Sequence, residues 1–173
     1  MRLAPKRAVA SFAAAAASAA VLVAEPSAAW AGPGKHRDCI AYSGLTEVTH
    51  LSITDGGEPG EGAGDVVDFH TELLDADGDL VGRNVGRAVV FADPATGRLK
   101  EFVTGIDYLP GGTVASAGTI DLISAVSGEE QSIGAVGVTG RFRGKVGART
   151  FRLIERTSPI ESISESGVSV CRR

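Results

Sequence analysis

The stretch VVDFHTELLDADGDLVGRNVGRAVVFA, residues 66–92, carries the clearest fold signal in the sequence. Val66 to Leu74 and Leu80 to Ala92 are rich in β-branched and other apolar residues, which favour β-strands. Between them, Asp75-Ala-Asp-Gly78 suits a tight turn, because Asp and Gly accept the backbone angles that hairpin turns require. The stretch therefore predicts a β-hairpin.

The acidic turn also resembles a calcium-binding loop, since Asp75, Asp77 and Asp79 alternate. An EF-hand would need flanking helices and a glutamate at the twelfth loop position. Counted from Asp75, that position is Gly86, and both flanks favour strands. We therefore interpret the segment as a hairpin turn.

The rest of the chain repeats the pattern of β-rich segments bounded by Gly, Pro, Asp or Ser. Eight strands are predicted: Ile40–Thr54, Val66–Leu74, Leu80–Ala92, Leu99–Tyr108, Thr113–Ile123, Ile133–Thr139, Ala148–Thr157 and Ile160–Val170. Short turns imply antiparallel neighbours, and about eight strands can close into a barrel that holds side chains or one small ligand. We predict an all-β fold, an eight-stranded antiparallel β-barrel, with a two-sheet sandwich as the alternative.

The first 31 residues have the pattern of a secretory signal peptide. A basic start is followed by an almost wholly apolar run from Ala8 to Ala24, and Ala29-Trp30-Ala31 or Ser27-Ala28-Ala29 offers a cleavage site. A membrane anchor is the alternative, but a spanning helix needs about 20 strongly apolar residues. We predict a signal peptide over 1–31, a loose mature N-terminus over 32–38 and one barrel domain over 39–173. The exported protein would then be extracellular, with no membrane contact.

Two cysteines lie near the two ends of the predicted domain, Cys39 and Cys171. In an oxidising compartment such an isolated pair is most simply a disulfide, and two free thiols are the alternative. A disulfide would bring the first and last strands together at their ends, as closure of a barrel requires.

Composition excludes several functional classes. The formal charge of −4 and the 5% aromatic content argue against a nucleic-acid partner. Two cysteines and three histidines are too few for an ordinary zinc finger, and no catalytic triad is recognisable, so we predict neither a metal nor a cofactor and do not favour a hydrolase.

Two polar clusters are candidates for a site. Asp68, His70 and Glu72 share one face of a predicted strand, and we expect that face to be solvated because the opposite face is more apolar. Arg141, Arg143, Lys145 and Arg149 form a basic cluster in the sequence. Such clusters are usually solvated, but this one could face an anion.

Three segments in order resemble the dirigent and allene oxide cyclase barrel superfamily. Val81-Gly-Arg-Asn-Val-Gly86 is similar to V-G-R-A-Q-G, Leu109-Pro-Gly-Gly-Thr-Val-Ala-Ser-Ala-Gly118 to Y-x-G-S-T-L-x-x-x-G, and Gly137-Val-Thr-Gly-Arg-Phe-Arg-Gly-Lys-Val-Gly147 to G-G-T-G-x-F-x-x-A-R-G. Val138 replaces a glycine of the last signature, and Lys145-Val146 replaces Ala-Arg. The resemblance covers about residues 65–157 and points to bacterial secreted relatives.

The resemblance implies an antiparallel barrel with an apolar cavity, a homotrimer and an end-to-end disulfide. It also implies isomerase, cyclase or stereo-directing activity on a small apolar or phenolic molecule, but it assigns no catalytic residue. As cavity-wall candidates we name Tyr42, Arg87, Asp107 and Tyr108. The alternative function is a non-enzymatic extracellular scaffold or protein-interaction module whose barrel is filled by side chains.

Overall fold

A computed structural model of the chain describes residues 38–57 and 62–173. Its elements in chain order are β1 (Cys39–Thr54), β2 (Val66–Leu74), β3 (Leu80–Ala92), β4 (Leu99–Leu109), β5 (Gly112–Asp121), α1 (Leu122–Val126), β6 (Gln131–Gly137), a single 3₁₀ turn η1 (Gly140–Phe142), β7 (Val146–Ser158) and β8 (Glu161–Cys171). The predicted signal peptide and all but the last residue of the predicted loose N-terminus lie outside the described residues. Within the described part, no helix is long and apolar enough to cross a membrane.

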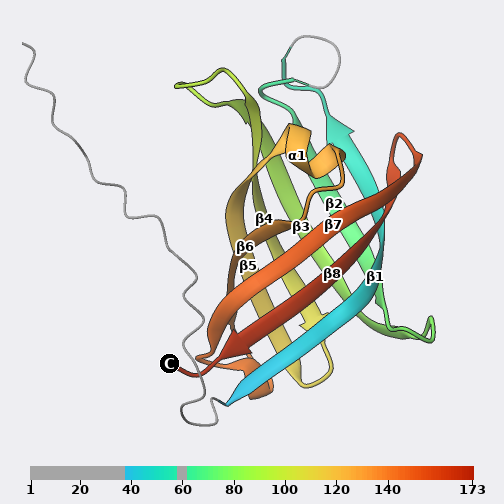
Figure 1. Cartoon of the computed structure of the whole chain (residues 1–173), viewed down its shortest axis with the longest axis vertical. Coiled ribbons are helices and arrows are strands. Elements are labelled where there is room, and N and C mark those ends of the chain that lie inside the picture. Colours follow the sequence, from blue (N-terminus) through green and yellow to red (C-terminus); the bar gives the residue numbers. More distant parts are fainter. Residues whose placement is uncertain (1–37, 58–61) are drawn as a thin grey trace, which may run out of the picture. The chain divides into compact units, whose positions relative to one another are not determined.

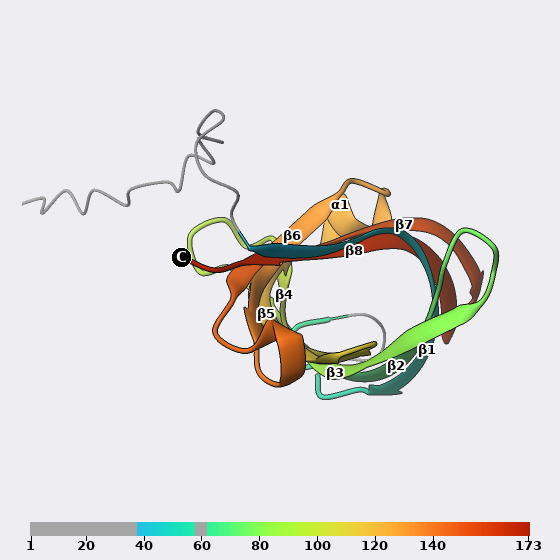
Figure 2. The same ribbon diagram turned by 90° about the horizontal axis from the view of Figure 1, so that it is seen from below.

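In the described residues, eight strands pair in sequence order and close into an antiparallel barrel. Figure 2 shows the strands arranged in a ring, with β8 beside β1. The two strands that close the ring place Cys39 opposite Cys171, and these residues form a disulfide with their Cα atoms 4.0 Å apart. The predicted barrel and the predicted disulfide are both confirmed.

Alternation along the strands separates an inner face from an outer face. On β4 the odd-numbered residues from Val103 to Leu109 are buried, and the even-numbered residues between them are exposed. Successive side chains of a strand point to opposite faces, so the odd positions of β4 face the barrel interior. The same period runs through β8, where the even positions from Ser164 to Val170 are buried.

A β-bulge in β1 reverses this alternation near the start of the barrel. Between Tyr42 and Leu45, β1 advances by one residue more than its partner β8. Gly44 lies inside the bulge with a φ of 64°, a left-handed conformation that glycine adopts without steric cost. As a result Tyr42 faces inward before the bulge, and Leu45 and Glu47 face inward after it.

One end of the barrel is filled by a hydrophobic core. Phe142 of η1 is fully buried there, together with residues that come from six strands. These residues are Leu45, Leu73, Leu109, Val114, Ala135, Val168 and Val170. Ile40, Tyr42 and Val81 pack against this core from its edge. Side chains therefore close this end, which is also the end that carries the disulfide.

The opposite end carries α1, a five-residue helix next to the barrel opening (Figure 1). The Asp121 side chain caps it by accepting a 3.0 Å hydrogen bond from the Ser124 backbone N–H. We predicted a strand through Ile123, but the chain leaves the sheet at Asp121. A helix this short spans too few residues to show helical periodicity, although its N-cap residue is a recognisable signal.

The outer surface confirms two of the sequence interpretations. Asp75 accepts hydrogen bonds from the N–H groups of Asp77 and Asp79, and Gly78 has a φ of 85°, as expected for a hairpin turn. Asp68, His70 and Glu72 lie on the outer face: Asp68 pairs with Arg87, and the His70 ring stacks on that of His50.

An apolar row also crosses the outer face. Val85, Ile106, Ala115 and Val136 are consecutive partners across β3, β4, β5 and β6. Val85, Ile106 and Val136 are exposed, and Phe102 is exposed on the same face of β4.

Candidate functional site

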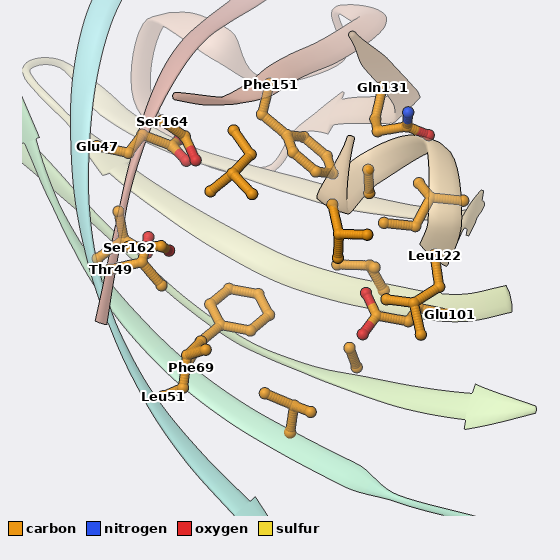
Figure 3. Close-up of a pocket in the computed structure, with 18 of the residues that line it drawn as sticks. Glu47, Thr49, Leu51, Phe69, Glu101, Leu122, Gln131, Phe151, Ser162 and Ser164 are labelled. Atoms are coloured by element: carbon orange, nitrogen blue, oxygen red, sulfur yellow. The ribbon is translucent and has the colours of Figure 1, made fainter. Parts of the chain in front are cut away.

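A cavity of about 200 Å³ occupies the half of the barrel that lies next to α1. Residues that face inward on β1 mark its depth: Glu47 lies deepest, followed by Thr49, Leu51 and then Ile53 toward the opening. Figure 3 shows Glu47 beside Ser164 of β8 on one side of the cavity, and Glu101 beside Leu122 on the other. The cavity thus extends from a polar floor in the middle of the barrel to the opening.

Apolar side chains make up most of the cavity wall. The apolar wall residues include Leu51, Val67, Phe69, Ala88, Val103, Ile120, Leu122, Phe151 and Leu153. Ala88, Val103, Ile120 and Ile133 form a second buried cluster, and the Phe69 and Phe151 rings pack against it. A wall of this kind favours apolar ligands.

Gly86 provides the space in which the Phe69 ring lies. It is opposite Phe69 in the β2–β3 register. A Cβ atom at Gly86 would lie 2.5 Å from Cζ of Phe69 and 2.1 Å from the carbonyl oxygen of Thr104, both too close for non-bonded atoms. The last glycine of the Val81–Gly86 motif therefore leaves room for an aromatic ring in the wall of the cavity.

The floor of the cavity is a chain of buried polar side chains. Nε of Arg149 donates a 3.1 Å hydrogen bond to Oδ1 of Asp107, and Nη2 of Arg149 donates to Oε1 of Glu47. Asn84 donates a 2.8 Å bond from Nδ2 to the same Asp107 oxygen. Because these four residues come from β7, β4, β1 and β3, the polar floor spans the barrel interior and separates the cavity from the filled end.

The charges of this floor are almost fully removed from water. Glu47 is 5% exposed, Arg149 6% and Asp107 not at all. Burial alone would lower the pKa of the Arg149 guanidinium, but the carboxylates of Glu47 and Asp107 outweigh that effect and raise this pKa above its ordinary value. Arg149 is therefore a permanent cation that the two acidic residues hold in one orientation, next to the face of the Phe151 ring at 5.6 Å.

Hydroxyl groups continue the polar surface from the floor upward. Thr49 and Thr71 share a 2.9 Å hydrogen bond between their Oγ1 atoms, and Ser162 and Ser164 lie on β8 beside them. Because β1 pairs with both β2 and β8, these four residues form one polar strip on an otherwise apolar wall. A ligand would meet polar groups at the floor and along this side.

The four residues predicted for the cavity wall lie in three different places, and none of them borders the cavity. Arg87 and Tyr108 are on the outer face, where Arg87 pairs with Asp68 and Tyr108 lies under the Arg83 guanidinium. Tyr42 packs at the filled end and donates a hydrogen bond to the Pro110 carbonyl oxygen. Asp107 is part of the floor, but its fully buried side chain does not border the cavity.

Strand alternation explains these placements. Asp107 and Tyr108 are adjacent, so they could not share a face, and Arg87 follows the inward-facing Gly86. Sequence reasoning missed Glu47, Asn84 and the cavity role of Arg149. A usable signal was present for Glu47 and Arg149, because each is a charged residue on a strand face that otherwise carries mainly apolar side chains. Asn84 lies between Gly82 and Gly86 on its face, so its strand gave no such signal.

The basic sequence cluster does not form one patch in the structure. Arg149 is buried at the cavity floor, and the buried Lys145 donates a 2.7 Å hydrogen bond to the Asp38 carbonyl oxygen. Arg141 lies over the rings of Tyr42 and Phe142. Arg149, Lys145 and Arg141 thus lie in three different environments and do not form a shared anion site.

Metal binding has no evident location in the described ranges 38–57 and 62–173. No group of three or more His, Cys, Asp or Glu side chains there has an arrangement that could hold a metal ion.

Comparison with known families gives one match over most of the barrel. The model of the family described as "allene oxide cyclase barrel like domain" matches residues 45–164. Among curated proteins, none matches this sequence.

Solved structures with the same fold include a nonspecific heme-binding cyclase that catalyses a 4 + 2 cycloaddition during neoabyssomicin biosynthesis. It is 22% identical, with a TM-score of 0.71 over 80% of this chain and 66% of that chain. The Diels-Alderase AbmU from Streptomyces koyangensis is 22% identical, with a TM-score of 0.70 over 79% of this chain and 65% of that chain. The chain thus spans about two thirds of the length of these two proteins.

A pterocarpan synthase dirigent protein is a third structural neighbour. It is 15% identical, with a TM-score of 0.61 over 82% of this chain and 89% of that chain. At these identities the likeness establishes the shared barrel fold.

Proposed function

Because the chain belongs to the allene oxide cyclase barrel-like family, we propose that it holds a small apolar or phenolic molecule in its cavity and directs the stereochemistry of its cyclisation or coupling. One observation carries the proposal: the cavity of about 200 Å³ has an apolar wall, an opening at the α1 end and a buried, charged floor. The cyclase, Diels-Alderase and dirigent neighbours support this class of activity.

The cavity can promote such a reaction without a nucleophile. A cyclisation that rearranges bonds within one molecule needs no co-reactant, so its main barrier is to bring the reacting atoms together in one folded conformer. The Phe69 and Phe151 rings restrict the shape that a bound molecule can take. An interior without bulk water also strengthens hydrogen bonds between the bound molecule and the protein.

The floor supplies oriented polar groups for this task. Arg149 is fixed by Glu47 and Asp107, and a group that is already held in place can stabilise developing charge without reorganising during the reaction. The hydroxyl groups of Thr49, Thr71 and Ser164 give further hydrogen-bonding positions beside it. These residues are the ones to which we assign contact with the polar end of the substrate.

We also propose that the protein is exported and that it assembles as a homotrimer. The disulfide between Cys39 and Cys171 supports export, because such bonds persist in oxidising compartments. The exposed apolar row across β3 to β6 supports assembly, because large apolar patches on soluble proteins mark contact surfaces.

The cavity favours ligand binding over the scaffold hypothesis, which requires a barrel filled by side chains. Native mass spectrometry of protein purified from its own culture medium tests this directly. We expect a small molecule to accompany the exported chain and to leave on denaturation.

Two substitutions of alanine by leucine test where that molecule binds. Ala88→Leu places extra volume in the cavity wall, whereas Ala41→Leu makes the same change on the exposed outer face of β1. We expect the first variant to lose the bound molecule and the second to keep it. If the Ala88→Leu variant retains the molecule, the molecule binds outside the cavity. If the molecule is absent from the wild-type protein and from both variants, the scaffold hypothesis is favoured.

A further inference from the structure

The cavity floor contains more negative than positive formal charge. Glu47 and Asp107 contribute two carboxylates, and Arg149 contributes one guanidinium. All three side chains are more than nine-tenths buried, so water screens their charges weakly. The excess negative charge acts on whatever occupies the space above the floor.

The opening of the cavity has the same imbalance. Among the described residues that line the cavity nearer to its opening, the charged ones are Asp65, Glu101 and Arg156, again two carboxylates and one guanidinium. Asp65 is 3% exposed and accepts hydrogen bonds from the N–H groups of Gly56 and Gly62 at 3.2 and 2.8 Å. A bound molecule would therefore experience negative potential at both ends.

The hydrogen bonds of the floor are directed toward its carboxylates. One N–H of Arg149 donates to Asp107 and another donates to Glu47, and Asn84 donates to Asp107 as well. Oδ2 of Asp107 is fully buried and has no hydrogen-bond partner among the described residues. Oδ1 of the same carboxylate accepts the hydrogen bonds from Asn84 and Arg149, which both border the cavity. A buried carboxylate oxygen without a donor is costly, so the floor favours positive over negative charge in the space above it.

We propose that the cavity selects apolar molecules whose polar end is a hydrogen-bond donor, an ammonium or a hydroxyl group, and discriminates against carboxylates. The inference rests on the proposed function, the binding of a small apolar molecule in this cavity. A carboxylate would add a further negative charge to a low-dielectric space that already has an excess of them. A hydroxyl group adds no charge and can donate to the Glu47 carboxylate, and an ammonium also balances the charge.

Three probes with one apolar body separate these effects. Naphthylmethylammonium, naphthylmethanol and naphthoate differ mainly in their polar end. A dry apolar cavity of about 150 Å³ holds benzene, so a naphthyl body suits a somewhat larger, open cavity. At pH 7 we expect the ammonium and the alcohol to bind the disulfide-bonded protein at least about tenfold more tightly than naphthoate, measured by titration calorimetry.

Two glutamate variants locate the source of the selectivity. Glu47→Gln removes a floor charge and keeps the side-chain shape, so the preference for ammonium over naphthoate should fall by about tenfold. Glu165→Gln makes the same change on the exposed face of β8, where Glu165 pairs with Arg152, and should leave the preference unchanged. Should Glu47→Gln fail to fold, Glu101→Gln at the half-buried opening tests the same charge effect.

The outcomes distinguish this inference from the proposed function. If all three probes bind equally, or naphthoate binds best, the cavity is a ligand site and the charge selectivity is wrong. If the preference exists but is unchanged in Glu47→Gln and Glu101→Gln, the cavity charges do not cause it, and the inference is overturned. If no probe binds and naphthalene itself does not bind, both proposals fail.

Discussion

Arg149 and Asp107 face each other across the interior of the barrel, with a 3.1 Å hydrogen bond from Nε of Arg149 to Oδ1 of Asp107. They lie on β7 and β4, strands that are not neighbours in the sheet. This hydrogen bond therefore links opposite parts of the barrel wall across the interior. It also forms the boundary between the filled half of the barrel and the cavity.

Replacement of Arg149 by methionine should destabilise the protein strongly. It would leave the buried carboxylates of Glu47 and Asp107 without their cation, and breaking a buried ion pair from one side costs about 3–5 kcal/mol. Urea denaturation of both proteins would measure this difference in the free energy of unfolding. Arg152→Met is the matched control, because Arg152 pairs with Glu165 on the exposed surface and such pairs contribute at most about 1 kcal/mol. Equal losses in the two variants would contradict the assigned role of the floor.

Gly86→Ala should reduce the cavity without adding a large group to it. The new Cβ atom would meet both the Phe69 ring and the Thr104 carbonyl oxygen, so the ring and the backbone of β4 must both shift, and overpacking of this kind costs about 1–3 kcal/mol. We expect naphthylmethanol to bind the variant about tenfold more weakly in titration calorimetry, because the displaced ring enters the ligand space. In Gly134→Ala the nearest contact of the added atom is at 3.5 Å, so binding should be unchanged. Normal binding by Gly86→Ala would show that Phe69 does not shape the site.

Removal of the disulfide should lower stability without altering the topology. The bond links residues separated by 132 positions, and the chain-entropy model gives a loop of that size about 4–5 kcal/mol. Cys39→Ser combined with Cys171→Ser should therefore shift the denaturation midpoint to much lower urea. Because the bond lies at the filled end, far from α1, probe affinity measured well below that midpoint should stay the same. Lower affinity in the folded double variant would contradict this separation of the two ends.

The proposed trimer depends on the apolar row of the outer face. Ile106 is 39% exposed and lies in the middle of that row, so Ile106→Glu would place a charge at the centre of the contact. We expect light scattering to give a trimer for the wild-type protein and a monomer for the variant. Thr46→Glu is the control, an exposed position on β1 away from the row. A wild-type monomer would remove the trimer from the proposal.

Local sequence signals predicted much of the fold correctly. Strand-forming residues and the Asp75–Gly78 turn predicted one hairpin, and its predicted strand bounds agree with those of β2 and β3. The positions of the cysteines predicted the closure of the barrel at Cys39 and Cys171. These features depend on residues close in sequence or on a covalent bond, so no knowledge of the interior was needed.

The site was harder to predict, because it depends on which face of each strand turns inward. The bulge at Gly44 reverses that face within β1 and sends Tyr42 to the filled end. Arg149 belonged to a basic cluster in the sequence, yet its strand position turns it into the barrel.

The sequence by itself determined the strands, their turns, the pairing of the cysteines and the family, since each follows from local propensity, covalent chemistry or motif spacing. The tertiary structure alone decided that Glu47, Asn84, Asp107 and Arg149 meet. They come from four strands separated by up to 102 residues, and their contact requires the closed ring and the register of every strand pair between them. Barrel closure converts these scattered polar residues into the floor of one cavity.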